Sequence, residues 1–188
     1  MTSDAVENLD PRSVVNFMIE YGKVRDYKLK NVSLQKLLYF CHAAYLVRHG
    51  KPLVSGYFEA WEYGPVHRTV YDALRQYGRQ EVTKPIDRRD PFTGQVSVIS
   101  PPHNIVVTDH VEQTMRTLGR IAPGHLIALS HAADGPWHYV WNKSKLEPVL
   151  GNRITDKITL ERFARLKASL TFEPLFGDTD EASPLTGD

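Results

Sequence analysis

The sequence predicts a mainly α-helical fold, a compact helical domain around a central buried helix at about residues 34–49, with a small β-hairpin or sheet element. Ten of the eleven residues 37–47 are apolar, so this helix is expected to be surrounded by others. Apolar residues three or four positions apart predict further helices on both sides of it. Helical periodicity stops at Gly78, and the Pro- and Gly-containing residues 79–102 predict a surface β-hairpin between two helical halves.

The composition is that of an ordinary globular protein. The chain has 188 residues, 41% of them hydrophobic, which suits one domain with a real core. Its 23 Lys and Arg and 22 Asp and Glu leave a net charge of +1, which argues against nucleic acid or anionic lipid as a partner. Cys41, the single cysteine, excludes an internal disulfide, and the longest apolar run is shorter than the ~20 residues of a membrane span. We therefore expect a cytoplasmic protein without a membrane partner.

Helix starts and stops are indicated by capping residues and glycines. Asp10 before Pro11 and Ser33 are predicted N-caps, and Asp109 is predicted to begin a later helix with a capping arrangement. Gly22 and Gly50 are expected to end the first two helices. The predicted helices span about 11–21, 34–49, 65–77, 108 or 109 to 118, 123–133, 137–141 and 159–170.

A short extended segment is expected between the central helix and the next one. Residues 57–63 alternate in a way that suits a strand, with Tyr57, Trp61 and Tyr63 on one face. The pair Gly64-Pro65 is typical of a helix start. We expect the segment 57–63 and residues 96–107 to form the small β element.

The ends of the chain differ in composition from its middle. Residues 1–10 are polar and are expected to be flexible, and residues 11–172 are expected to form the domain. Residues 173–188 contain five acidic and no basic side chains among Gly, Pro, Ser and Thr, which predicts a disordered acidic tail.

No pattern of catalytic or metal-binding residues is evident. His125, His131 and His138 are six and seven residues apart, which matches no common ligand spacing, so we expect no metal and no cofactor. Ser130 and His131 are neighbours on a predicted helix, where side chains diverge by about 100°, so no catalytic relay with Asp134 is expected. His131 is instead expected to hydrogen-bond across a helix junction. The prediction is a protein without enzymatic activity, with a small hydrolase or metal-dependent enzyme using the His131 region as an alternative.

Polar residues form a narrow stripe on the central helix. Gln35, His42 and His49 are seven residues apart and lie on one face. Such a stripe is typical of a hydrogen-bonded core network, a solvated edge or a surface that faces a partner.

Several motifs in a fixed order give the sequence a family resemblance. They are LQKLLYF, HGKPL, FEAWEYGPV, VYDALRQYG, LSHAADGPW and ITLERF, and their main residues are Gln35, Lys36, Trp61, Pro65, His131 and Trp137. In these motifs the chain resembles the Panacea antitoxin domain, a phage-associated family with GepA-like and SocA-like members. The resemblance covers about residues 13–172.

The resemblance implies the antitoxin of a bacterial or prophage toxin-antitoxin system. Such a protein neutralises a separately encoded toxin by direct binding, and many toxins paired with this family act on translation. Because many toxin operons regulate themselves, a DNA-binding transcriptional autoregulator is a second alternative, although the segment between the second and third predicted helices is too long for a helix-turn-helix.

The surface that binds the toxin is predicted near the two Gly-Pro pairs. Both pairs combine a rigid turn with aromatic side chains, which lose little entropy on binding. The expected partner-binding residues are Tyr63, Pro65, His67, Trp137 and Tyr139. Residues 79–102 are the next candidate surface.

Overall fold

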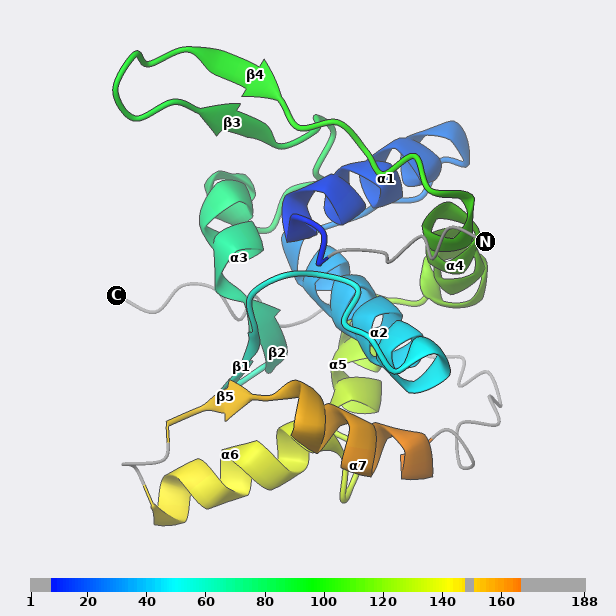
Figure 1. The fold of residues 1–188 in the computed structure, drawn as a ribbon, viewed down its shortest axis with the longest axis vertical. Coiled ribbons are helices and arrows are strands. Elements are labelled where there is room, and N and C mark those ends of the chain that lie inside the picture. Colours follow the sequence, from blue (N-terminus) through cyan, green and yellow to red (C-terminus); the bar gives the residue numbers. More distant parts are fainter. Residues whose placement is uncertain (1–7, 148–150, 167–188) are drawn as a thin grey trace, which may run out of the picture.

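A computed structural model describes residues 8–147 and 151–166 of the chain. The helices are α1 (Pro11–Val24), α2 (Asn31–His49), α3 (Arg68–Leu74), the 3-10 turn η1 (Arg75–Tyr77), α4 (Ile105–Leu118), α5 (Pro123–Ser130), α6 (Pro136–Leu146) and α7 (Asp156–Leu166). The strands are β1 (Phe58–Trp61), β2 (Gly64–His67), β3 (Asp87–Arg89), β4 (Val96–Val98) and β5 (Arg153–Ile154). The fold is mainly α with small β elements, as predicted (Figure 1).

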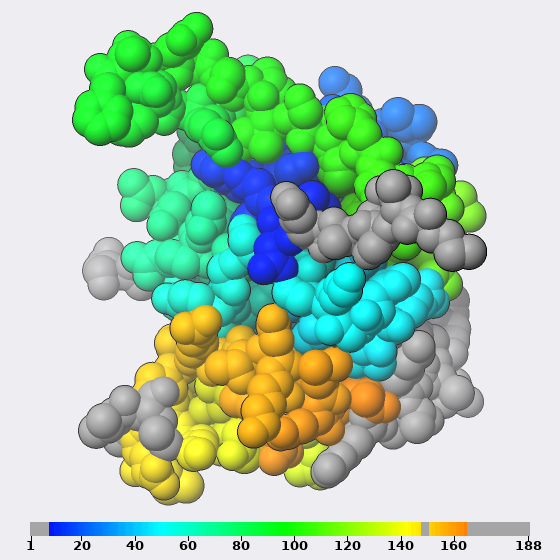
Figure 2. Space-filling view, in the orientation of Figure 1, coloured from blue at the N-terminus to red at the C-terminus, as the bar shows by residue number. Residues whose placement is uncertain are grey.

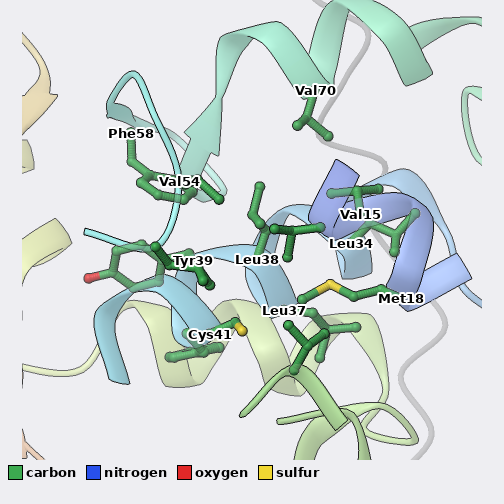
Figure 3. Close-up of a cluster of buried hydrophobic side chains, with 14 of the residues drawn as sticks. Val15, Met18, Leu34, Leu37, Leu38, Tyr39, Cys41, Val54, Phe58 and Val70 are labelled. Carbon is green, nitrogen blue, oxygen red and sulfur yellow. The ribbon is translucent and has the colours of Figure 1, made fainter. Parts of the chain in front are cut away.

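Helix α2 is the centre of the fold, which confirms the prediction from its apolar residues. Of its 19 residues 14 are buried, because α1, α3, α4, α5, α7 and β2 all pack on it. Leu34, Leu37 and Leu38 are fully buried and meet Val15 and Met18 of α1 (Figure 3). Cys41 is buried in the same core.

The ends of the first two helices agree only in part with the predictions. The Asp10 side chain accepts a hydrogen bond from the Arg12 backbone N–H, as an N-cap should. Gly22 does not end α1; it leaves room for Leu29, whose Cδ1 would lie 2.5 Å from a Cβ at this position. Ser33 does not cap α2, which begins two residues earlier and buries Ser33 in its first turn. Gly50 ends α2 in the left-handed conformation, as predicted.

The small sheet has the strand order β2-β1-β5 and is antiparallel throughout. Residues 64–65 are therefore not a helix start: they begin β2, and α3 starts only at Arg68. The reason is that Gly64, at φ +99°, takes a conformation that closes a two-residue hairpin with β1. Residues 96–107 do not join β1; its second neighbour is β5, and the Ala60 N–H also donates to the Asn152 carbonyl at 2.7 Å.

Strands β3 and β4 form a hairpin that projects from the body of the molecule (Figures 1 and 2). All six of their residues are exposed, which agrees with the predicted surface hairpin. Asn16 of α1 holds its base. Its Nδ2 donates to the carbonyls of Ile86 and Ile99, at 2.9 and 2.7 Å, and its Oδ1 accepts from the Ile86 N–H at 2.6 Å.

The second helical half follows the predicted order with shifted bounds. Helix α4 begins at Ile105, because the Asn104 side chain caps it, and Asp109 lies inside it. Residues 105–107 are thus helical rather than extended. The predicted end of the last helix, residues 167–170, lies outside the described residues, as do residues 1–7 and the acidic tail. In the described ranges no helix is long and apolar enough to cross a membrane.

Candidate protein-binding site

The six residues of the sequence motifs lie together in the structure, and we call them the motif junction: Gln35, Lys36, Trp61, Pro65, His131 and Trp137. Trp137 Nε1 donates to the Trp61 carbonyl at 2.8 Å and so ties α6 to β1. Lys36 Nζ donates to the Pro65 carbonyl at 3.0 Å and ties α2 to β2. The His131 ring stacks on Trp137 with 3.6 Å between ring centroids. The two Gly-Pro turns, 71 residues apart in sequence, are therefore parts of one structure.

Lys36 is the least ordinary member of the motif junction. Its side chain is fully buried, and burial away from water lowers the pKa of the amine to about 7. Its Nζ makes one hydrogen bond, and none of the acidic side chains in residues 8–147 and 151–166 forms an ion pair with it. Glycine is required beside it, because a Cβ on Gly64 would lie 2.8 Å from Lys36 Cε and 2.5 Å from Ser130 Oγ.

An open cleft of about 510 Å³, which we call the aromatic cleft, lies over the motif junction. Its walls come from α2, the β1–β2 hairpin, α3 and α6, with Asn152 beside β5. Four half-buried aromatic residues line it, together with Lys36 and Arg68: Trp61, Tyr63, Tyr71 and Trp141.

Three of the four aromatic residues of the cleft are held by neighbouring side chains. Trp61 Nε1 donates to Glu59 Oε2 at 2.7 Å, and the Trp61 and Tyr71 rings meet edge to face at 4.8 Å. Trp141 stacks on Trp137 with 5.4 Å between centroids. Because these rings are held before any partner arrives, they have little freedom left to lose on binding.

The five expected partner-binding residues are not all on the surface. Tyr63 lines the aromatic cleft. Pro65, His67 and Trp137 are buried, so they do not present their side chains to a partner. The His67 ring bonds to the Ser55 carbonyl at 2.9 Å, and its backbone N–H donates to Gln35 Oε1. Tyr139 lies outside the cleft, with the Arg162 guanidinium 3.8 Å from its ring centroid.

The residues around His131 do not form a catalytic relay. Ser130 Oγ donates to the Ile127 carbonyl at 2.8 Å, so its proton is directed to the backbone rather than to an imidazole. The expected hydrogen bond of His131 across the helix junction is not formed: its ring stacks on Trp137, and its buried Nε2 has no partner within the described residues. Burial lowers the pKa of His131 to about 4, so the ring is neutral at pH 7.

The polar stripe of α2 belongs for the most part to the core network. Gln35 and His42 are buried, and His42 Nε2 lies 3.2 Å from Asp156 Oδ1 of α7. The other ring nitrogen of His42 accepts from the Val54 N–H at 3.4 Å. His49 is exposed and packs its ring on Tyr45, 4.2 Å between centroids. Two of the three residues therefore connect segments inside the fold.

The expected partner-binding set did not include Tyr71, Trp141 and Arg68, which line the cleft. Trp141 is four residues after Trp137 on one helix face, which would have placed both rings on the same side. Tyr71 and Arg68 gave no such signal, because their position depends on the turn that leads from β2 into α3.

A second, smaller groove of about 220 Å³ lies between α2, α4, α5 and α7. Its lining is mainly apolar, with Phe40, Leu118, Leu129 and Phe163, and includes no residue of the motif junction. The aromatic cleft is therefore the stronger candidate for a binding site.

Comparison with known proteins gives two agreeing results. Residues 34–138 match the family model described as "Antitoxin SocA-like, Panacea domain". The chain is 37% identical over 178 residues to the protein named Antitoxin SocA from Caulobacter vibrioides (strain NA1000 / CB15N), a match that covers 95% of both chains. No solved structure matches the chain. The range matched by the family model contains all six residues of the motif junction.

Proposed function

Because this chain belongs to the SocA-like antitoxin family with a Panacea domain, we propose that it neutralises its toxin by binding it directly as a folded protein. The family implies a toxin as the partner. The direct mechanism is our proposal, and it needs a preformed surface rather than a catalytic residue. Occlusion of this kind requires slow release, which comes from a few well-packed anchors in an interface on the order of 1,600 Å².

The aromatic cleft is the observation that supports this mechanism. Trp, Tyr and Arg are the residues that contribute most to protein–protein affinity, and the cleft contains two Trp, two Tyr and Arg68. All four aromatic residues are half-buried, so each keeps part of its surface open to a partner. We therefore revise the expected partner-binding set to Trp61, Tyr63, Tyr71 and Trp141, with Trp137 supporting Trp61 and Trp141.

Co-expression with the toxin tests the mechanism. The product of the gene next to this one is the first candidate toxin. We expect that it stops growth when expressed alone, that this chain restores growth, and that the two proteins co-purify in a fixed ratio. Restored growth without a detectable complex would contradict neutralisation by direct binding.

Alanine substitutions then test the surface. Tyr71→Ala and Tyr63→Ala should each weaken the complex by about 2 kcal/mol while leaving the thermal midpoint of the free protein nearly unchanged. Tyr57→Ala is the matched control: Tyr57 is 42% exposed on the same hairpin segment, outside the cleft. Normal affinity in both cleft variants would show that the toxin binds elsewhere, and the β3–β4 hairpin would be tested next.

A further inference from the structure

The wall of the aromatic cleft contains a buried amine whose hydrogen-bonding capacity is mostly unused. An ammonium group has three N–H donors, and Lys36 Nζ uses one of them on the Pro65 carbonyl. The side chain is 1% exposed, so water replaces few of the missing partners. Burial therefore favours the neutral amine, and an opposite charge placed beside it would restore the charged form.

The acidic side chains near the cleft do not supply that opposite charge. Glu62 lines the cleft but is exposed and forms no ion pair in the described part of the chain. Glu59 accepts from Trp61 Nε1, and Asp72 pairs with Arg68 at 3.3 Å. The His131 ring is neutral at pH 7, so it adds no charge of either sign. Within the described residues Lys36 therefore has no ion-pair partner of its own, although acidic side chains lie nearby.

The residues that line the cleft around Lys36 limit which chemical group can supply the missing negative charge. Trp61, Tyr63, Tyr71 and Trp141 surround a space of about 510 Å³, which is larger than one amino-acid side chain. Flat aromatic walls with one buried cation suit a group that is apolar along its length and negative at its end.

We propose that the aromatic cleft receives an acidic side chain of the bound toxin, flanked by apolar residues, and that Lys36 is the counter-ion of its carboxylate. This inference rests on the proposed function, because it names the group by which the toxin would be recognised. Lys36 then has two roles: in the free protein it ties α2 to β2, and in the complex it contributes to specificity. A neutral amide in the same position would leave the amine without its counter-ion.

The preference of the cleft for a carboxylate is tested on the free, full-length protein. The two probes, indole-3-acetate and indole-3-acetamide, have matched shapes and differ in charge. NMR signals of the indole N–H groups of Trp61 and Trp141 report binding in the cleft. We expect the carboxylate to bind about tenfold more tightly than the amide, as for a hydrogen bond between charged groups. Equal affinity of the two probes, or no shift of either indole signal, would overturn the inference.

Two variants show whether Lys36 is responsible. Lys36→Met keeps the length of the side chain and should abolish the preference for the carboxylate, whereas Lys143→Met, at an exposed position of α6 outside the cleft, should keep it. A preference that persists in folded Lys36→Met would assign the charge to Arg68 and contradict the proposal. Lys36→Gln, which retains a donor for the Pro65 carbonyl, gives the same comparison if the Met variant does not fold.

The toxin complex separates this inference from the proposed function. Lys36→Met should weaken the co-purified complex by about tenfold, from the loss of one charged hydrogen bond. A complex of unchanged affinity would overturn the inference and leave direct neutralisation standing, whereas absence of any complex with the unmodified chain would overturn direct neutralisation.

A variant that combines Asp178→Asn, Asp180→Asn and Glu181→Gln tests whether acidic residues of the chain itself occupy the cleft. Tighter probe binding in this variant would show that the chain itself supplies the carboxylate, which contradicts a group from the toxin.

Discussion

The motif junction and the β3–β4 hairpin differ in how many other parts of the fold they contact. The junction joins α2, β1, β2, α5 and α6 by side-chain contacts between segments far apart in sequence. The hairpin strands pair only with each other, and the tip residue Phe92 is 96% exposed. All six main motif residues lie in the junction and none in the hairpin. The motifs thus mark the place where several elements depend on the same few side chains.

This comparison predicts how the two regions respond to substitution. In the junction one side chain supports the fold and the shape of the aromatic cleft together, so loss of stability and loss of binding should coincide. In the hairpin the two effects should be separable.

Trp137→Ala should have the largest effect, because it removes a buried ring, the stack with His131 and the hydrogen bond to the Trp61 carbonyl. The expected loss in the free energy of unfolding is about 3 to 5 kcal/mol. Urea unfolding followed by circular dichroism measures it. Trp137→Phe, which keeps a ring but removes the donor, should lose clearly less; an equal loss would mean that the hydrogen bond, not packing, dominates.

Asn16→Ala should have the next largest effect, since it leaves three backbone groups of Ile86 and Ile99 at the hairpin base without their partner. Buried polar groups without partners should lower the free energy of unfolding by about 2 to 3 kcal/mol. Ser13→Ala is the control, because Ser13 makes a single bond to the Ser100 carbonyl nearby. If Asn16→Ala costs no more than this control, the hairpin is held by its flanking apolar residues instead.

Acidic pH should destabilise the motif junction through His131. The pKa of this ring is lowered from 6.5 in the unfolded chain to about 4, mainly by burial. The unfolded chain therefore binds the proton first, and stability falls as the pH drops from 6.5 toward 4. Since the ring is only half-buried, we expect a loss of about 1 kcal/mol between pH 7 and pH 5. His131→Phe should keep the stack and lose this part of the pH dependence, measured as urea midpoints at both pH values.

Phe92→Ala should have the smallest effect on the fold. Its side chain contributes almost no burial, so the change in the free energy of unfolding should stay within about 0.5 kcal/mol. Toxin affinity is the informative measurement here. A large loss of affinity at unchanged stability would make the hairpin, rather than the aromatic cleft, the binding surface.

The central helix and the order of the other helices were predictable because apolar periodicity records which face is buried. Starts were less predictable, since Ser33 and Asp109 have the chemistry of caps but lie inside their helices. The pair Gly64-Pro65 suits both a helix start and a hairpin, and only the pairing of β1 with β2 decides between them. Strand β5 has two residues, too few for a periodic signal.

The binding site was predictable to a similar degree. The two Gly-Pro turns were named from sequence, and the structure brings them together. Which side of each turn faces solvent was not predictable, because His67 and Trp137 are buried by elements distant in sequence. Lys36 was recognised as a motif residue, but its burial depends on how closely Gly64 packs against it.

The pairing of β1 with the segment around β5 makes one backbone group a natural reporter. The Ala60 N–H donates to the carbonyl of Asn152, and Asn152 lines the aromatic cleft. A ligand that rests against Asn152 restrains the opening of this bond, and by thermodynamic linkage the exchange of the Ala60 amide with deuterium should slow in proportion to occupancy. A single amide of the central strand β1 would thus record when the cleft is filled.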